Sequence, residues 1–320
     1  MRVVILGGAG FLGQKLTKAL LEKGDIKGQA ISKLLVFDRF EANLEADERL
    51  EQITGDISQP TTLEKLILPD TDVIIHLAAI VSGEAEQNFD LGMQINLHAT
   101  EALLEVCRKL NKPPQFLFAS SIAVFGGDMP EIIEDNTAPT PQSSYGAQKA
   151  ICELLINDYS RKGFIDGIIL RFPTIVVRPG KPNAATSTFA SSIIREPLQG
   201  QEAICPVTGD TKLWILSPRQ AIRSAVKALD MDTDLLGSHR TLSLPGITVS
   251  VQDMVTSLEE ISGKAVVDRI VWQHSHFIQQ IVGSWPSRFT ARRALELGFE
   301  PDASMTEIIQ NFIEDDLVKT

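Results

Sequence analysis

The sequence has few cysteines, few histidines and only two tyrosines, and the first two of these scarcities limit the possible functions. Cys107, Cys152 and Cys205 are odd in number and widely spaced, so we expect reduced thiols in a cytoplasmic protein rather than a disulfide scaffold. The five histidines show no ligand spacing with cysteines or acids. The exception is one His-Ser-His at 274–276, which we interpret as solvated surface, so the sequence predicts no metal site.

Long apolar runs and basic runs are also missing. No apolar stretch approaches the length of a membrane span, and the first predicted strand starts at residue 2, so we expect neither a signal peptide nor a membrane partner. A net charge of −11 without a basic run argues against a nucleic-acid partner. With 320 residues, 43% of them apolar, the chain can form one or two globular domains.

A glycine-rich turn follows the first apolar run. Residues 3–6 are apolar and largely β-branched, as in a buried strand, and Gly7, Gly10 and Gly13 follow with the spacing G-x-x-G-x-x-G. From Leu12 onward, apolar residues recur every three or four positions, which predicts a helix. This order predicts a pyrophosphate site, because N–H groups at the helix start face the ligand and glycine lets it approach. The alternative is a turn without a ligand.

A second apolar run, residues 34–38, ends in the carboxylate of Asp38, twenty-five residues after Gly13. A carboxylate there accepts hydrogen bonds from the adenosine ribose hydroxyls and repels a 2′-phosphate, so we expect NAD as the cofactor. The neighbouring Arg39 favours the opposite choice, NADP.

Two later strands are expected to add cofactor contacts. Asp56 and Ile57 follow the strand 50–54, at a place where such sheets often contact adenine. The strand 73–79 ends in the small residues Ala78 and Ala79, which either admit the nicotinamide ribose or only allow close packing.

A long helix is predicted from Phe89 to Leu110, and it carries a polar residue, Asn96, among apolar ones. Asn96 either bridges to the catalytic region or satisfies buried backbone groups.

Tyr145 and Lys149 lie four residues apart in a stretch with helical periodicity, so their side chains share one helix face. The predicted strand before them, residues 115–121, ends in Ser120 and Ser121. This spacing uses one of only two tyrosines and follows both a glycine turn and a strand that ends in hydroxyl groups.

These pieces together resemble the extended short-chain dehydrogenases/reductases, which form the NAD-dependent epimerase/dehydratase family. The matching motifs are GGAGFLG at 7–13, HLAA at 76–79, FASSIAVFG at 118–126 and YGAQK at 145–149. The resemblance implies an α/β fold: a Rossmann-type doubly wound parallel sheet with a smaller C-terminal α/β domain that closes over the substrate. It also implies a homodimer, paired through helices around 89–110 and 145–160.

By the family pattern, Ser121, Tyr145 and Lys149 are the catalytic residues. A tyrosine has an unperturbed pKa of about 10, too high for a general base at neutral pH. Lys149 and the positive nicotinamide favour the phenolate, and a decrease of about three units corresponds to roughly 4 kcal/mol. Ser121 would orient the substrate hydroxyl, and Lys149 would also bind the nicotinamide ribose.

The resemblance and the patterns above together give two sets of site residues. The residues expected to contact NAD are Gly7, Gly10, Phe11, Leu12, Gly13, Asp38, Asp56, Ile57, Leu77, Ala78, Ala79, Asn96, Tyr145, Lys149, Pro173 and Thr174. The residues expected to contact the substrate are Ser120, Ser121, Tyr145, Thr174, Arg178 and Asn183.

Two stretches of the second half depart from the nucleotide-sugar epimerases of the family. Thr174 stands where those enzymes have an asparagine that contacts the diphosphate, and residues 213–221 lack an acid that those enzymes carry. Both departures disfavour a nucleotide-sugar substrate.

Residues 178–192 are small and polar with two cations, Arg178 and Lys181, which suits a compact anionic ligand. RPGKPN and IIREPLQGQE resemble the subgroup of D-erythronate dehydrogenases. Arg178 or Lys181 binds the substrate carboxylate, or both lie in a solvated loop. Asn183 contacts the substrate or is likewise structural, and Arg195 forms a structural ion pair.

The sequence therefore predicts NAD-dependent oxidation of the C2 hydroxyl of a small sugar acid such as D-erythronate. One alternative is 4-epimerisation of a nucleotide sugar, and the other is a non-catalytic NAD-binding scaffold or sensor. We expect an NAD-binding domain over 1–172 with a return segment near 213–243. We expect a substrate domain over 173–212 and 244–320, with a strand at 265–270.

Overall fold

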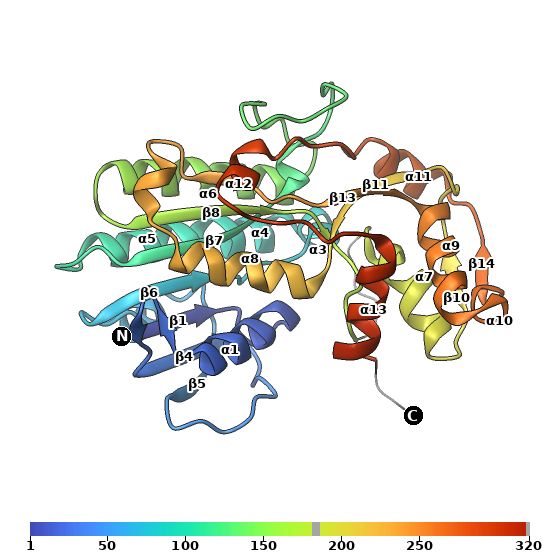
Figure 1. Cartoon of the computed structure of the whole chain (residues 1–320). Coiled ribbons are helices and arrows are strands. Elements are labelled where there is room, and N and C mark those ends of the chain that lie inside the picture. The colour runs from blue at the N-terminus through green and yellow to red at the C-terminus, as the bar shows by residue number, and fades with distance from the viewer. Residues whose placement is uncertain (181–185, 318–320) are drawn as a thin grey trace. The chain divides into compact units, whose positions relative to one another are not determined.

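The computed structural model describes residues 1–180 and 186–317 and divides the chain into two compact units (Figure 1). The first unit comprises Met1–Ser121, Ser143–Arg171 and Ile222–Leu242. The second comprises Ile122–Gln142, Phe172–Ala221 and the chain from Ser243 onward.

Two segments lie in a different unit from the one expected. Residues 122–142 and 213–221 belong to the second unit, although the sequence placed them in the NAD-binding domain. The first segment is held there by a ring contact between Phe125 and Phe289 and by a β-bridge between Ile133 and Phe289. The segment 213–221 contains most of a strand that belongs to a separate sheet.

The first unit is built on a seven-stranded sheet of order β12-β8-β7-β6-β1-β4-β5. The strands are β1 (Arg2–Leu6), β4 (Lys33–Asp38), β5 (Leu50–Thr54), β6 (Thr71–His76), β7 (Gln115–Ser121), β8 (Asp166–Phe172) and β12 (Thr241–Ser243). The pairs β5–β4, β4–β1, β1–β6 and β6–β7 are parallel. The order reverses beside β1, which confirms the predicted doubly wound parallel sheet.

Helices cover both faces of this sheet, which explains why its strands are continuous apolar runs. They are α1 (Phe11–Lys23), α2 (Pro60–Leu66), α3 (Ser82–Gln87), α4 (Phe89–Gly92), α5 (Ala99–Arg108), α6 (Ser144–Arg161) and α8 (Pro218–Asp230). In Figure 1, α1 and α8 lie in front of the sheet, and α5 and α6 lie behind it. One core cluster joins Val4, Phe37 and Ile74 of the strands to Leu103 of α5 and Ile156 of α6.

The predicted helix from Phe89 to Leu110 consists of three segments. A π-helical stretch, η1 (Met93–His98), separates α4 from α5, and Asn96 lies inside it. The helix begins after Asn88, whose side chain accepts a hydrogen bond from the Leu91 N–H. A π segment within an α-helix is rare and is frequent at functional sites.

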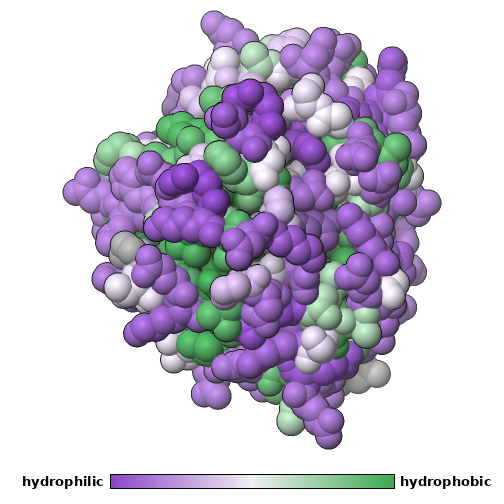
Figure 2. Space-filling model, turned by 90° about the vertical axis from the view of Figure 1, so that its left-hand side faces the viewer, coloured by the Kyte–Doolittle hydropathy of each residue, from purple (hydrophilic) through white to green (hydrophobic). Residues whose placement is uncertain are grey.

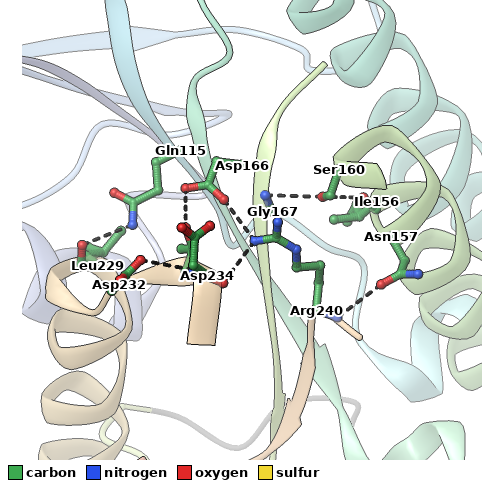
Figure 3. Close-up of polar contacts among 11 residues, drawn as sticks. Gln115, Ile156, Asn157, Ser160, Asp166, Gly167, Leu229, Asp232, Asp234 and Arg240 are labelled. Carbon is green, nitrogen blue, oxygen red and sulfur yellow. Dashed lines mark hydrogen bonds and ion pairs between the residues drawn. The ribbon is translucent and has the colours of Figure 1, made fainter. Parts of the chain in front are cut away.

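Polar contacts fix the returning segment of the first unit to the sheet (Figure 3). Arg240 donates to Asp166 at 2.9 Å, and its backbone N–H donates to Asn157 of α6 at 3.0 Å. The Gln115 side chain donates to the Leu229 carbonyl at the end of α8. These bonds lie where β7 and β8 begin, away from the strand ends that carry the serines.

Short elements complete the first unit and its connections. They are the hairpin β2 (Asp25–Ile26) and β3 (Gln29–Ala30) and the 3-10 turns η2 (Ile122–Val124), which lies in the second unit, and η3 (Thr233–Leu236).

The second unit contains two small sheets with helices around them. β9 (Thr174–Ile175), β11 (Lys212–Leu216) and β13 (Ile247–Ser250) form one sheet, and β10 (Ala203–Cys205) and β14 (Ile270–Trp272) form the other. The helices are α7 (Thr188–Leu198), α9 (Val251–Ser262), α10 (Lys264–Val267), α11 (His276–Gly283), α12 (Arg292–Glu296) and α13 (Met305–Asp315). The strand predicted at 265–270 is wrong, because residues 264–267 are helical and the strand starts at Ile270.

The face in Figure 2 is mostly hydrophilic, with apolar residues exposed between the hydrophilic ones. Within residues 1–180 and 186–317, no helix combines the length and the apolar character needed to cross a membrane. All three cysteines are free and buried.

Candidate active site

The glycine turn brings β1, α1 and the end of β6 into close contact. Gly7 has φ +84°, and a Cβ on it would lie 2.4 Å from the Ala78 nitrogen. A Cβ on Gly13 would lie 2.4 Å from the Gly7 carbonyl oxygen. Gly10 is the N-cap of α1 and has no side chain to bond the first-turn N–H groups. Gly7 and Gly13 thus have a steric reason to be glycine, and the helix start without a side-chain cap at Gly10 favours an anion there.

Replacing Gly13 by alanine is expected to lower the free energy of unfolding by about 1–3 kcal/mol, because the added methyl group overlaps backbone atoms. Gly10→Ala is the matched control, since its Cβ meets only the Gly7 oxygen, at 3.3 Å. Urea unfolding without cofactor measures both, and equal stability of the two variants would contradict the prediction.

A cavity of about 360 Å³ opens beside this turn, within the first unit. Its lining residues are Gly7, Ala9, Gly10, Phe37, Asp38, Arg39, Phe40, Glu41, Gly55, Ile57, Leu77, Ala78, Ala79, Ile80 and Ile95. The carboxylate of Asp38 accepts hydrogen bonds from the backbone N–H groups of Ala9, at 3.0 Å, and Arg39, at 2.7 Å. The glycine turn, the strand-end carboxylate and the apolar walls fit the adenosine and pyrophosphate of a dinucleotide.

Some residues predicted to contact the cofactor lie outside the lining of this cavity. Phe11, Leu12 and Gly13 belong to α1 and its first turn. Asp56 accepts hydrogen bonds from the backbone and hydroxyl of Ser58, which lower the pKa of its carboxyl group. Its neighbour Ile57 is the one that lines the cavity.

Sequence reasoning also missed several lining residues. Phe37, Arg39 and Phe40 surround Asp38, and Gly55 and Ile80 follow β5 and β6. Their position in the sequence, close to strand ends already predicted to contact the cofactor, was the signal that could have identified them.

Ser121, Tyr145 and Lys149 all belong to the first unit, at the end of β7 and the start of α6. Ser121 and Tyr145 are half-buried, and Lys149 is 2% exposed. The Lys149 Nζ atom lies 5.7 Å from the Tyr145 ring centroid and donates to the Ala119 carbonyl at 2.8 Å. Ser143 caps the helix by accepting from the Gly146 N–H, which fixes the turn that carries Tyr145.

The pKa of the Lys149 ammonium is low for a lysine. Burial lowers its pKa to about 8, and the nearby Cys152 and Glu153 act in the opposite direction. An ammonium with such a pKa stays charged at neutral pH and can stabilise a phenolate beside it.

Asn96 makes contacts of both kinds considered from the sequence, with buried backbone groups and with the helix that carries Lys149. Its side-chain oxygen accepts from the Ile80 N–H at 2.8 Å, and its amide donates to the Ile80 carbonyl. The same amide donates to Gln148, the neighbour of Lys149, at 2.7 Å. Asn96 therefore satisfies buried backbone and also links the loop after β6 to α6, rather than lining the cavity.

His76, at the end of β6, is a fully buried neutral histidine. The Thr100 hydroxyl donates its one proton to the Asn96 carbonyl, so the His76 Nε2 donates to Thr100. Among the described residues, the Nδ1 atom has no hydrogen-bond partner. Burial and the charge of Lys149 lower the pKa of His76 to about 3.

Acid is expected to destabilise the protein through His76. In the unfolded state the pKa of His76 returns to about 6.5, so the unfolded chain binds a proton at pH values where the folded protein does not. The free energy of unfolding therefore falls as the pH decreases below 6.5. From pH 7 to pH 5 this contributes a loss of about 2 kcal/mol. Chemical unfolding at both pH values tests it: His76→Gln should lose about that much less than the wild type, and equal losses would contradict the prediction.

Ser120 does not have the environment expected of a substrate ligand. Its side chain is buried, at 3% exposure, and its hydroxyl donates to Glu153 at 2.6 Å. Glu153 in turn pairs with Arg171 of β8. Lys149, four residues before Glu153, and the charge of Arg171 inside an apolar strand were the signals for this cluster.

The remaining predicted site residues belong to the second unit or to undescribed positions. Thr174 begins β9, Pro173 directly precedes that strand, and Arg178 follows it. The Arg178 guanidinium donates to the Ile175 carbonyl and to Ser187, both at 3.3 Å. Lys181 and Asn183 lie outside the described residues.

Two arginines of the second unit form ion pairs. Arg195 pairs with Glu196 at 2.6 Å, which confirms the predicted structural ion pair. Arg219, within the stretch that lacks the epimerase acid, pairs with Glu314 and Asp315 of α13.

Comparison with known proteins gives a consistent set of relatives. The profile of the NAD dependent epimerase/dehydratase family matches residues 3–231. The D-erythronate dehydrogenase of Cupriavidus necator is 50% identical over 319 residues, 98% of each chain. The D-erythronate dehydrogenase of Haemophilus influenzae is 48% identical over 317 residues, 99% of this chain and 100% of that one.

Solved structures give the same architecture. The nucleoside-diphosphate-sugar epimerase from Agrobacterium tumefaciens superposes with a TM-score of 0.95 at 44% identity, over 99% of this chain and 94% of that chain.

Proposed function

The chain belongs to the NAD dependent epimerase/dehydratase family, and on that premise we propose that it oxidises the C2 hydroxyl of D-erythronate to the 2-keto acid. The observation that carries the proposal is the near full-length identity to two D-erythronate dehydrogenases, 50% and 48%. The small, polar sequence stretch 178–192 and Thr174, which stands in place of an asparagine, support the same substrate class.

Each residue of the site then has a defined task. Asp38 accepts hydrogen bonds from the ribose hydroxyls of the cofactor, and the N–H groups at the start of α1 bind the pyrophosphate. Tyr145 removes the proton of the substrate hydroxyl, Ser121 orients that hydroxyl, and Lys149 stabilises the phenolate. NAD held by these residues would supply the acceptor for the hydride that leaves C2.

The substrate carboxylate needs a cation in this proposal. Arg178 and Lys181 are the two candidates from the polar sequence stretch 178–192, and charge-assisted hydrogen bonds from either contribute about 1.5–3 kcal/mol each. Arg178→Met and Lys181→Met identify the anchor, since the variant that loses it should raise the KM for D-erythronate and leave NAD affinity unchanged.

One experiment separates the proposed reaction from its alternatives. The purified protein with NAD receives either D-erythronate or UDP-sugars, and NADH absorbance and sugar isomers are followed separately. NADH in proportion to the acid consumed supports the dehydrogenase. Epimers without net NADH would support a nucleotide-sugar epimerase, the alternative favoured by the likeness to the nucleoside-diphosphate-sugar epimerase from Agrobacterium tumefaciens. NAD binding without either product would support a non-catalytic sensor.

The assembly is proposed to be a cytoplasmic homodimer. The pairing helices carry exposed apolar side chains: Leu154 is 74% exposed and Ile151 41% on α6, and Phe89 is 57% exposed on α4. Free buried cysteines suit a reducing compartment. Light scattering should give twice the chain mass of 35.1 kDa, and a monomer mass would refute the dimer.

A further inference from the structure

Helix α6 holds the last residues of β7 through two side chains one helical turn apart. The Lys149 Nζ atom donates to the Ala119 carbonyl at 2.8 Å, and Glu153 accepts from the Ser120 hydroxyl at 2.6 Å. Ser121 follows directly, so both residues before it are bonded to α6, Ala119 through its backbone carbonyl and Ser120 through its side-chain hydroxyl.

A buried ion pair fixes Glu153 itself. Arg171, on the neighbouring strand β8, donates from Nε at 2.9 Å and 3.1 Å and from Nη2 at 2.6 Å. Both side chains are 5% exposed, and this two-pronged geometry is the strongest form of the pair. Ser120, Glu153 and Arg171, called here the β7 anchor, therefore connect β7, α6 and β8 rigidly.

The β7 anchor also places charge near Lys149. Glu153 and Cys152 lie on the same helix, His76 faces Lys149 from β6, and the ring of Phe118 on β7 is 4.4 Å from its Nζ atom. His76 is neutral near pH 7, and burial keeps the Cys152 thiol protonated with a pKa of about 11. Glu153, itself paired with Arg171, is therefore the anion that counteracts the lowering of the Lys149 pKa by burial.

We propose that the β7 anchor consists of positioning residues for the reaction: it holds Ser121 in place and keeps a carboxylate one helical turn from Lys149. The proposal rests on the proposed function. It replaces the predicted role of Ser120 as a substrate ligand with one exerted through its neighbours.

Ser120→Ala distinguishes a positioning role of Ser120 from a role as a substrate ligand. The substitution removes one hydrogen bond and leaves the ion pair between Glu153 and Arg171 intact. A misplaced Ser121 should lower kcat for D-erythronate by about tenfold to a hundredfold with KM unchanged. Ser120→Thr restores the hydroxyl and should recover kcat. A raised KM with unchanged kcat would mean that Ser120 binds the substrate and would overturn the proposal.

Glu153→Gln tests the electrostatic part. Loss of the carboxylate leaves the Arg171 charge uncompensated by Glu153, and both changes disfavour the ammonium, so the basic limb of the pH profile of kcat should move to lower pH. A purely structural contact would change the rate without moving that limb.

A titration that needs no turnover accompanies this profile. NMR of isotope-labelled lysines, with the Lys149 signal assigned by its absence in Lys149→Met, should give a midpoint near pH 8 in the wild type and a lower one in Glu153→Gln. An unchanged midpoint in folded Glu153→Gln would overturn the electrostatic part. If the wild type makes no NADH from D-erythronate, the proposed function fails, while this titration still decides the anchor.

Discussion

Tyr145→Phe is expected to lower kcat for D-erythronate by about 10²–10⁴, the contribution of a positioned general base. The substitution keeps the ring that lies 5.7 Å from the Lys149 Nζ atom and removes only the oxygen that, as a phenolate, takes the substrate proton in the proposed reaction. Initial rates of NADH formation at saturating NAD and acid measure the effect. Because the ring is retained, the KM for the acid should change much less than kcat.

The second tyrosine of the chain provides the matched control. Tyr159 lies on α6 as well, with its hydroxyl bonded to Glu105 and its ring against Phe164. Burial and Glu105 raise its pKa to about 12, so it stays a phenol. Tyr159→Phe should keep the wild-type kcat. A Tyr145→Phe variant as fast as this control would show that the catalytic base is another group.

Arg171→Leu is expected to lower the free energy of unfolding by about 3–5 kcal/mol, because it leaves the carboxylate of Glu153 buried without its partner. Removing both charges, in Arg171→Leu with Glu153→Leu, should recover most of that loss, since the uncompensated charge is then gone. Urea unfolding at neutral pH measures both variants.

An exposed pair on the same helix is the control for this loss. Arg161 and Asp158 form an ion pair with side chains 66% and 58% exposed. Arg161→Leu should change the unfolding free energy by about 1 kcal/mol or less. Equal losses for Arg161→Leu and Arg171→Leu would mean that the buried pair contributes no more than a surface one.

The architecture of the first unit could be predicted because local patterns and tertiary environment agree there. Residues 3–6 and 34–38 are apolar without alternation, and the structure buries them between helices, where only such runs fit. The glycine spacing demanded a tight turn, and Gly7 has the positive φ that such a turn needs. The family suggested by these motifs is confirmed.

Other features do not follow from the local apolar pattern. Ala265 to Ile270 looks like a strand from its valines, but Gly263 ends α9 and a further helical turn follows it. Asn96, inside the π segment, forms hydrogen bonds with Ile80 and Gln148, and apolar periodicity does not reveal such contacts. The role of Ser120 depends on Glu153, thirty-three residues away.

The position of β12 has a consequence for biosynthesis. This strand lies beside β8 at the sheet edge, yet it comes after some seventy residues that mostly belong to the second unit. While the ribosome is still making that intervening chain, β8 has one unpaired edge, which is a site for wrong strand pairing. Its Gly167 N–H already bonds to Ser160 of α6. The sheet of the growing chain therefore keeps one unpaired edge until residues 241–243 have been made. Contacts so distant in sequence form slowly.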